Sequence, residues 1–438
     1  MWRSVIKTVS LFYGRGNQNA LRSLQTAQKA LSHPFQGYRQ HTSTAFKVNT
    51  MIQPIIQVEA LDKDRCITVR WEDGSESLYP YVWLRDNCQC SQCFLHSAKA
   101  RKFPIADLDV NVVAEKVTLT NSAKISVTWP DKHISEFNAD WLKHRCFGKS
   151  TREKLQEDFF LTEKQYWGSD LQIPTTTFDA VLSDDEAAYQ WLRNLRRVGI
   201  AVLKDTPKEK GQVNKLVKRI GYHRMTFYGY TWQVEDKINA NNLAYTSGNL
   251  SLHTDYPSLH NPPGIQFLHC IKQAEVGGES EIADGFHLAN QLRQQYPEAF
   301  RILTSTLVDF TDSGVDYCDF SVQSKNKTIM LDHKGNVVRI HYSSAIRDSV
   351  FDLPVEQVHP FYSALKKFWD LIYKPENLVT FKMEPGDVMT FDNWRLLHGR
   401  RSYTTTKDST RHLEGAYVDW DEVMSRLRCL KRIIKATK

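Results

Sequence analysis

Residues 250–270 read LSLHTDYPSLHNPPGIQFLHC, and they place a histidine and a carboxylate two positions apart just before an apolar run. On a strand or extended turn, residues i and i+2 point to the same side, so His253 and Asp255 can reach one metal ion together. The pair therefore requires extended backbone, and it favours a β framework built around a metal site.

The rest of the chain fits such a framework. From about residue 227, strand-like segments dominate, separated by turns such as NPPGI and MEPGDV, and two helices are expected near residues 286–304 and 354–373. We predict a mainly β jelly-roll domain with flanking helices over residues 151–438. Short alternating segments such as CITVRW and KISVTWP predict a smaller β domain over residues 51–150.

A third metal ligand is needed, and His398 in the strand-like segment FDNWRLLHGR is the best candidate. Two histidines and one carboxylate on one side of an ion leave its other side open, which suits Fe(II). Arg411, in TRHLEGAY, is expected on the next strand, where a guanidinium can bind a carboxylate bidentately. The pattern is typical of oxygenases whose 2-oxoglutarate chelates iron at its keto acid end and binds arginine at its other end.

Three of the eight cysteines form the tight cluster DNCQCSQC. Cys88, Cys90 and Cys93 can surround one tetrahedral ion, and His133 is the preferred fourth ligand, with Cys66 and Cys146 as alternatives. Four protein ligands would make a structural Zn(II) site. An iron–sulfur cluster is less favoured because no fourth cysteine is well placed, and the scattered remaining cysteines do not form a disulfide framework.

The net charge of +7 is concentrated at one end of the chain. Residues 1–50 contain seven lysines and arginines and no acidic residue, which predicts a mitochondrial transit segment. The alternatives are a disordered leader, or translation from Met51, which would leave the protein in the cytoplasm. Because the remainder is close to neutral, we expect no nucleic-acid partner. No apolar run approaches the roughly 18 residues of a membrane span, so no membrane partner is expected.

Several longer motifs of the chain resemble those of one protein family. YPYVWLRDNCQCSQC, LHTDYPSLHNPPGIQFLHCIKQ, GGESEIADGF, VDYCDFSVQSK, FDNWRLLHGRRSY and RHLEGAYVDWDEVMSRL resemble the γ-butyrobetaine and trimethyllysine dioxygenase family of Fe(II)/2-oxoglutarate oxygenases, over about residues 52–430. The resemblance implies a zinc-binding N-terminal domain, a catalytic double-stranded β-helix and a homodimer. It also implies hydroxylation of γ-butyrobetaine at C3 to L-carnitine, the last step of carnitine biosynthesis, with O₂ and 2-oxoglutarate consumed, succinate and CO₂ released, and ascorbate keeping the iron reduced.

The resemblance also assigns residue roles, motif by motif. It implies that His253, Asp255 and His398 hold iron, and that Cys88, Cys90, Cys93 and His133 hold zinc. Arg411 and Ser280 would bind 2-oxoglutarate. The trimethylammonium group of the substrate would meet aromatic faces supplied by Tyr228, Trp232, Tyr245, Tyr256 and Tyr417. Asn242 would bind the substrate carboxylate. The chain departs from the family pattern near residue 343, where Ser343 and Ser344 stand in place of asparagine and have a shorter reach.

Three other functions share some of these features. Trimethyllysine dioxygenase shares the iron, the co-substrate and the aromatic residues, and a mitochondrial leader favours it. A catalytically inactive binding module would not need His253, Asp255, His398 and Arg411 together. A zinc-dependent nucleic-acid protein is disfavoured because the chain after residue 50 is nearly neutral.

Overall fold

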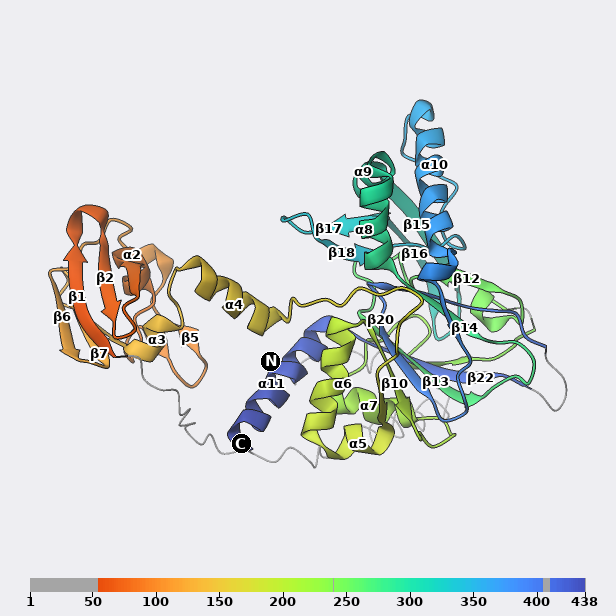
Figure 1. Ribbon diagram of the computed structural model, residues 1–438, viewed down its shortest axis with the longest axis horizontal. Helices are drawn as coiled ribbons and strands as arrows, with labels where there is room; N and C mark the ends of the chain where they lie inside the picture. The colour runs from red at the N-terminus through yellow and green to blue at the C-terminus, as the bar shows by residue number, and fades with distance from the viewer. Residues whose placement is uncertain (1–53, 239, 405–409, 438) are drawn as a thin grey trace, which may run out of the picture. The chain divides into compact units, whose positions relative to one another are not determined.

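The computed structural model describes residues 54–238, 240–404 and 410–437 (Figure 1). The predicted leader, residues 1–50, lies outside them. The described residues form an N-terminal β region, up to residue 160, and the region predicted to carry the iron site, from residue 161 on, which is called the catalytic region. Within the described residues, no helix combines the length and the apolar character that a membrane crossing requires.

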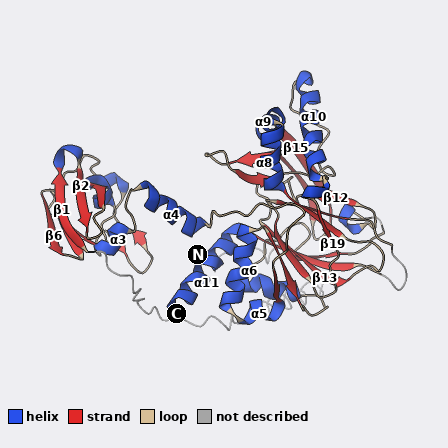
Figure 2. Ribbon diagram, viewed as in Figure 1, coloured by secondary structure: helices blue, strands red, loops and turns tan. Residues whose placement is uncertain are grey.

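The N-terminal region contains two three-stranded antiparallel sheets with the orders β1-β2-β3 and β6-β7-β8 (Figure 2). In β8, alternate residues are buried, as the sequence alternation predicts. Its elements are β1 (Ile55–Leu61), η2 (Asp62–Asp64), β2 (Cys66–Trp71), β3 (Glu76–Pro80), α2 (Tyr81–Asp86), β4 (Phe94–Leu95), β5 (Ala100–Arg101), η3 (Ile105–Asp107), β6 (Lys116–Asn121), β7 (Lys124–Thr128), β8 (Ile134–Asn138), α3 (Ala139–Lys143) and α4 (Lys149–Phe160).

The catalytic region is built on two sheets. A six-stranded sheet has the order β11-β22-β13-β20-β10-β9, and a four-stranded sheet has the order β12-β21-β14-β19. The strands are β9 (Thr175–Thr177), β10 (Ile200–Lys204), β11 (Thr231–Val234), β12 (Leu250–His253), β13 (Ile265–Lys272), β14 (Ser280–Asp284), β15 (Leu307–Val315), β16 (Asp319–Lys327), β17 (Ile329–Leu331), β18 (Val337–Ile340), β19 (Val379–Phe381), β20 (Val388–Asp392), β21 (Leu396–Arg400) and β22 (His412–Val418).

Helices flank the two sheets (Figures 1 and 2). They are α5 (Phe178–Ser183), α6 (Asp185–Arg197), α7 (Gln212–Ile220), η4 (Leu243–Tyr245), α8 (Gly285–Gln295), α9 (Pro297–Ser305), α10 (Val355–Ile372), η5 (Pro375–Asn377) and α11 (Trp420–Thr437). The predicted fold class, a jelly roll with flanking helices and a small N-terminal β region, is confirmed.

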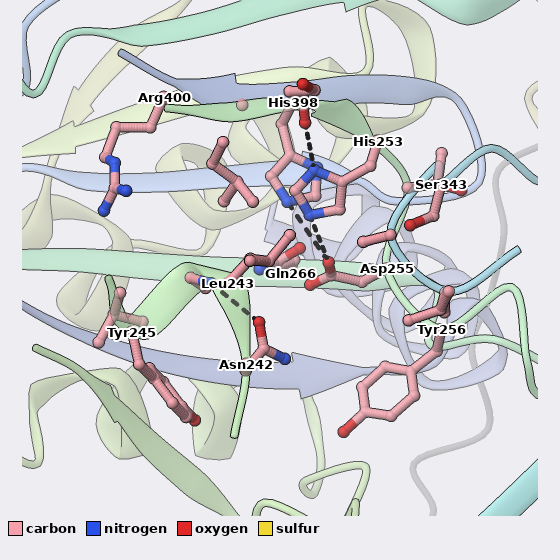
Figure 3. Close-up of a pocket in the computed structure, with 18 of the residues that line it drawn as sticks. Asn242, Leu243, Tyr245, His253, Asp255, Tyr256, Gln266, Ser343, His398 and Arg400 are labelled. Atoms are coloured by element: carbon pink, nitrogen blue, oxygen red, sulfur yellow. Dashed lines mark hydrogen bonds and ion pairs between the residues drawn. The ribbon is translucent and has the colours of Figure 1, made fainter. Parts of the chain in front are cut away.

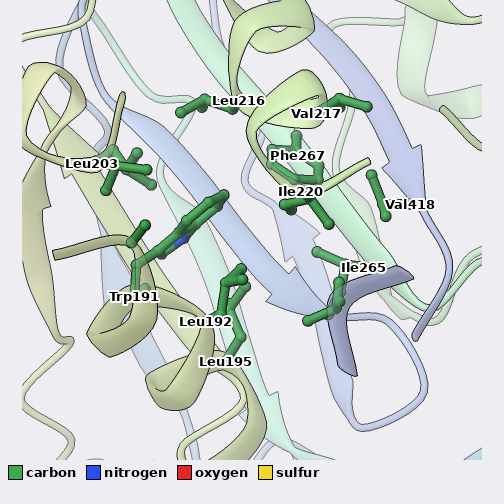
Figure 4. Packing of buried hydrophobic residues seen from close by; sticks show 14 of the residues in the cluster. Trp191, Leu192, Leu195, Leu203, Leu216, Val217, Ile220, Ile265, Phe267 and Val418 are labelled. Atoms are coloured by element: carbon green, nitrogen blue, oxygen red, sulfur yellow. The ribbon is translucent and has the colours of Figure 1, made fainter. Parts of the chain in front are cut away.

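One hydrophobic core joins α5, α6, α7 and α11 to the six-stranded sheet (Figure 4). At the start of α6, the Asp184 carboxylate accepts hydrogen bonds from the backbone N–H groups of Glu186 and Ala187, which caps the helix. Trp191 is buried on the sheet side of α6, and its indole N–H donates to the Thr390 hydroxyl of β20. A second core, between the two sheets, carries the residues that surround the active-site cavity.

The structure differs from the sequence expectations at two places in this region. The segment DVMTFDNWRLLHGR forms two strands in different sheets, β20 and β21, because Asp392 and Asn393 make a turn between them. The helix expected near residues 286–304 is split into α8 and α9 at Pro297, which cannot supply the backbone N–H that continues a helix.

The hairpin of β15 and β16 was not predicted. Nine register pairs join these strands, from Leu307–Lys327 to Val315–Asp319. Residues 311–313 of β15 line the active-site cavity, so this hairpin helps to position the site.

Candidate active site

The three predicted iron ligands meet where two antiparallel strands lie side by side. β12 pairs with β21 so that His253 lies directly opposite His398, and their ring centroids are 4.4 Å apart. Asp255 Oδ1 lies 3.1 Å from His253 Nε2 and 3.6 Å from His398 Nε2 (Figure 3). One ligand atom from each residue lies within 4.8 Å of the others, so the three residues fit a single cation.

Asp255 reaches this position by a turn and not along the strand. β12 ends at His253, and the backbone N–H of Asp255 donates to Asn393 Oδ1 at 2.7 Å. The Asn393 amide donates back to the Asp255 carbonyl at 3.0 Å, and Tyr256 adopts a φ of +58°. The sequence left open whether a strand or an extended turn carries both ligands. The structure uses Asn393, in the β20–β21 turn, to hold the carboxylate beside the histidines.

The surroundings act in different directions on the three residues. Burial alone would lower the pKa of His253, but the Asp255 carboxylate outweighs it and raises this pKa. The His253 Nδ1 contacts the Ser251 carbonyl at 2.8 Å, which leaves Nε2 for a metal. Burial, with the nearby His253, lowers the pKa of His398 to about 3, so its ring is neutral. Burial alone would raise the pKa of Asp255, but His398 and His253 outweigh it and hold this pKa well below its usual range.

The triad opens into a cavity of about 720 Å³. All the predicted iron, 2-oxoglutarate and substrate residues of the catalytic region line this cavity. Figure 3 labels the triad with Asn242, Tyr245 and Tyr256. The lining residues come from segments almost 200 residues apart in the sequence, and the two sheets bring them together.

One part of the cavity is cationic. Arg411 directly precedes β22, and Ser280 begins β14, where it pairs in register with Arg400 of β21. Arg400 and Arg411 are 4% and 5% exposed, and the Nε of each is buried without a hydrogen-bond partner. Buried cations with unused donors suit an anion such as a carboxylate. Arg400 was missed by the sequence analysis, although its position two residues after His398 on a strand places it on the same face.

The predicted aromatic residues form a continuous wall next to the triad. Trp232 of β11 stacks on Tyr417 of β22 at 4.2 Å between ring centroids, and Tyr256 meets Tyr417 at 5.7 Å. Tyr228 then contacts both Tyr256 and Tyr245 at 6.1 Å. The Tyr417 hydroxyl donates to Asp255 Oδ2 at 2.5 Å, which ties this wall to the metal ligands. Aromatic faces of this kind attract a quaternary ammonium group.

Of the polar residues near the expected position of the substrate carboxylate, Asn242 already makes hydrogen bonds within the protein. Asn242 caps η4 through its carbonyl oxygen, and its amide nitrogen donates to the Tyr228 hydroxyl at 3.0 Å. The second N–H of this amide is left for a ligand. Ser343 is 8% exposed and lines the cavity, as does the more exposed Ser344.

The cavity also contains an acidic side chain that the sequence analysis missed. Asp312 of β15 lines the same cavity as Tyr228 and Tyr256. Burial raises the pKa of Asp312, and the negative charge of Asp255 adds to the rise. No short motif marks this residue in the sequence, because its position depends on how the β15–β16 hairpin packs.

The cysteine cluster lies in the N-terminal region. His133 Nε2 is 3.3, 3.6 and 3.5 Å from the sulfur atoms of Cys88, Cys90 and Cys93. These four ligand atoms lie within 4.8 Å of one another, and neither Cys66 nor Cys146 belongs to the group. Burial lowers the pKa of His133, which keeps its ring neutral for metal binding. Three sulfurs and one imidazole nitrogen fit a tetrahedral zinc ion.

Comparison with protein families gives two matches along the chain. The taurine catabolism dioxygenase TauD, TfdA family matches residues 157–417, which include the triad and Arg411. A gamma-butyrobetaine hydroxylase-like N-terminal family matches residues 58–143, which include the cysteine cluster.

Individual relatives extend these matches to almost the whole catalytic and N-terminal regions. The chain is 59% identical to gamma-butyrobetaine dioxygenase of Homo sapiens, covering 87% of this chain and 98% of that protein. It is 33% identical to gamma-butyrobetaine dioxygenase of Pseudomonas sp. (strain AK-1), and this match covers 84% of this chain and 94% of that protein. It is 30% identical to mitochondrial trimethyllysine dioxygenase of Mus musculus, and this match covers 82% of this chain and 84% of that protein.

Proposed function

Because this chain belongs to the taurine catabolism dioxygenase (TauD/TfdA) family, we propose that its cavity hydroxylates γ-butyrobetaine at C3 to L-carnitine. The chain is a 2-oxoglutarate-dependent dioxygenase. In the proposed reaction, one oxygen atom of O₂ enters the C3–H bond, and the other enters succinate as 2-oxoglutarate loses CO₂. The observation that carries the proposal is the aromatic wall beside the triad, in one cavity with two buried arginines.

The metal ligands and the arginines account for the co-substrate. His253, Asp255 and His398 would hold Fe(II), which supplies with 2-oxoglutarate the oxidising chemistry of the family. Arg411 offers an unused buried N–H to the distal carboxylate, and Ser280, on β14 of the other sheet, lines the same cavity. This anion contact fixes the direction in which 2-oxoglutarate lies.

The aromatic wall accounts for the substrate. A trimethylammonium group has no N–H to donate, so hydrogen bonds cannot recognise it, whereas each aromatic face contributes about 0.5–2 kcal/mol. Tyr417 contacts both Trp232 and Asp255, so a cation held there lies close to the metal ligands. Asn242 and Ser343 supply donors for the carboxylate end. Holding both ends selects the carbon that faces the iron.

The test is succinate release by Fe(II)-loaded protein with 2-oxoglutarate and ascorbate, comparing γ-butyrobetaine, trimethyllysine and no added substrate. We expect release stimulated by γ-butyrobetaine, its loss in His253→Ala, and normal release in the matched control His260→Ala, an exposed histidine seven residues away. Stimulation by trimethyllysine alone would assign the second substrate of the family and overturn the proposal.

Three further parts of the proposal rest on the family and the donor sets. The four-ligand cluster of the N-terminal region holds structural zinc, ascorbate keeps the iron reduced, and the protein works as a homodimer. Elemental analysis and light scattering of the purified protein test the zinc and the dimer. Import into mitochondria through residues 1–50 stays a prediction, which organelle fractionation would test.

A further inference from the structure

Arg400 connects the cationic part of the cavity to the segment of residues 242–248. Its Nη2 donates to the carbonyls of Thr246 at 2.8 Å and Gly248 at 2.5 Å. The segment also carries Asn242 and Tyr245, which line the substrate part of the cavity. Arg400 therefore holds backbone that positions two substrate contacts, although it belongs to the strand that carries the iron ligand His398.

Arg400 and Arg411 both lie close to one aromatic ring. Their guanidinium carbons are 4.6 and 5.6 Å from the centroid of the Tyr403 ring. The backbone N–H of Tyr403 donates to the Ser247 carbonyl at 3.0 Å, so this residue also contacts the segment. One small group of side chains thus joins the anion site to residues 246–248.

The two guanidinium groups destabilise each other when no anion is present. Burial and, to a smaller extent, the like charge of Arg400 lower the pKa of Arg411 to about 10. Two buried cations repel each other strongly because little water screens them. A carboxylate bound at Arg411 compensates this repulsion, and it favours the arrangement in which Arg400 stays buried and holds the two carbonyls.

We propose that Arg400 is a positioning residue that couples occupation of the 2-oxoglutarate site to ordering of residues 242–248, and thereby tightens binding of the trimethylammonium substrate. The part that concerns the substrate rests on the proposed function. By thermodynamic linkage, the substrate tightens 2-oxoglutarate binding by the same factor. We expect a factor of about ten, within the usual range for coupled sites.

Hydrogen exchange tests the ordering without turnover. Fe(II)-loaded protein under argon is compared with and without saturating 2-oxoglutarate, and deuterium uptake is read in peptides that cover residues 242–250. We expect 2-oxoglutarate to slow exchange about tenfold in the native chain and to have little effect in Arg400→Gln. Arg401→Gln is the matched control, because this neighbouring arginine pairs with Glu281 and its side chain is half exposed.

Each outcome bears on the proposal. Protection in the native chain and Arg401→Gln, but not in Arg400→Gln saturated with 2-oxoglutarate, supports it. Equal protection in Arg400→Gln, or none in the native chain, overturns it. If Arg400→Gln does not fold, Arg400→Lys keeps the charge, but its ammonium ends one bond short of the Nη2 that donates to both carbonyls. We expect the protection to fall at least threefold.

A second measurement separates this inference from the proposed function. The dissociation constant of γ-butyrobetaine is measured by tryptophan fluorescence under argon, with and without 2-oxoglutarate. We expect about tenfold tightening in the native chain and less than twofold in Arg400→Gln. If γ-butyrobetaine does not bind the native chain at all, the proposed substrate is wrong, while the exchange experiment still decides the role of Arg400.

Discussion

At the scale of single residues, the site depends on side chains that contact the metal ligands without being ligands. Tyr417 is the main example, because its ring stacks on Trp232 and its hydroxyl donates to Asp255. Burial, and then the charge of Asp255, raises the pKa of Tyr417 well above its usual value, so the hydroxyl remains a donor. One residue therefore serves both the aromatic wall and the metal site.

Tyr417→Phe separates these two roles. The ring remains, so we expect the KM for γ-butyrobetaine to change less than about threefold. Asp255 loses a hydrogen bond to its charged form, so Fe(II) affinity should fall about 10- to 100-fold. Metal titration followed by turnover assays measures both, and Tyr245→Phe, whose ring lies farther along the wall, should bind iron normally. Normal iron affinity in Tyr417→Phe would contradict the role of the hydroxyl.

Asp312 is expected to favour a cationic substrate. Its carboxylate lines the cavity beside Tyr228, whose pKa is raised to about 12 by burial and, to a smaller extent, by Asp312. The compound 5,5-dimethylhexanoate has a carbon atom in place of the substrate nitrogen and so lacks the positive charge. We expect Asp312→Asn to lower the preference for γ-butyrobetaine over this analogue by about three- to tenfold. Competitive binding measures this preference. Asp319→Asn, an exposed change in the same hairpin, should leave it unchanged.

At the scale of elements, strand pairing decides which side chains can meet. β11 pairs with β22 so that Trp232 lies opposite Gly415. A Cβ built on Gly415 would lie 2.3–2.7 Å from three atoms of the Trp232 indole. The absence of a side chain at position 415 is therefore what allows Trp232 to stack on Tyr417.

Gly415→Ala should displace the Trp232 ring. We expect the KM for γ-butyrobetaine to rise about tenfold, the loss of one cation–π contact, while the KM for 2-oxoglutarate stays unchanged. Steady-state kinetics with each substrate varied in turn measures the two values. Gly314→Ala is the control, because its Cβ would make only ordinary contacts with Phe320 at 3.4 Å or more. Equal changes in both KM values would point to a general disturbance of the sheet.

In the N-terminal region, α2 supports the cysteine cluster through Arg85. Its Nη1 lies 3.6 Å from Cys93 Sγ, and its Nη2 lies 3.2 Å from Asp131, which accepts the His133 backbone N–H. This cation offsets part of the negative charge that three thiolates would bring. We expect Arg85→Gln to release zinc to a chelator at least tenfold faster than the native chain. The control is Arg70→Gln, which removes an exposed ion pair with Glu76 and should leave the release rate unchanged. An unchanged release rate in Arg85→Gln would show that Arg85 serves packing alone.

At the scale of the whole molecule, buried histidines make stability depend on pH. His269 is 0% exposed and His341 is 1% exposed, and burial lowers the pKa of each to about 4 from an ordinary value of 6.5. The unfolded chain binds a proton at these sites below pH 6.5, whereas the folded chain does so only near pH 4. Their contribution is therefore complete above pH 6.5 and is lost as the pH falls toward 4.

We expect the free energy of unfolding to fall by up to about 3 kcal/mol for each of these histidines over that interval. Urea unfolding at a series of pH values measures this fall. The slope should be smaller in His341→Asn, which removes a titrating group, and unchanged in His333→Asn, an exposed histidine. A flat pH dependence in the native chain between 6.5 and 4 would contradict the expectation.

The grouping of the candidate metal ligands was predictable from short motifs. His253 and Asp255 lie within three residues of each other, and Cys88, Cys90 and Cys93 lie within six, so local spacing alone indicates shared ligation. The turn that places Asp255 was not predictable, because it depends on Asn393 from another part of the chain. The role of Arg400 was missed for a similar reason, since its partners Thr246 and Gly248 lie about 150 residues away.

The sequence by itself determined the residue types, their local spacing and the helical or extended character of most segments, which are properties of short stretches of chain. Long motifs also indicated the family. Only the tertiary structure decided that His253 lies opposite His398, that Gly415 makes room for Trp232, and that Asp312 and Arg400 line one cavity. These facts depend on strand register and on packing between distant segments, which are set by the contacts of the whole fold.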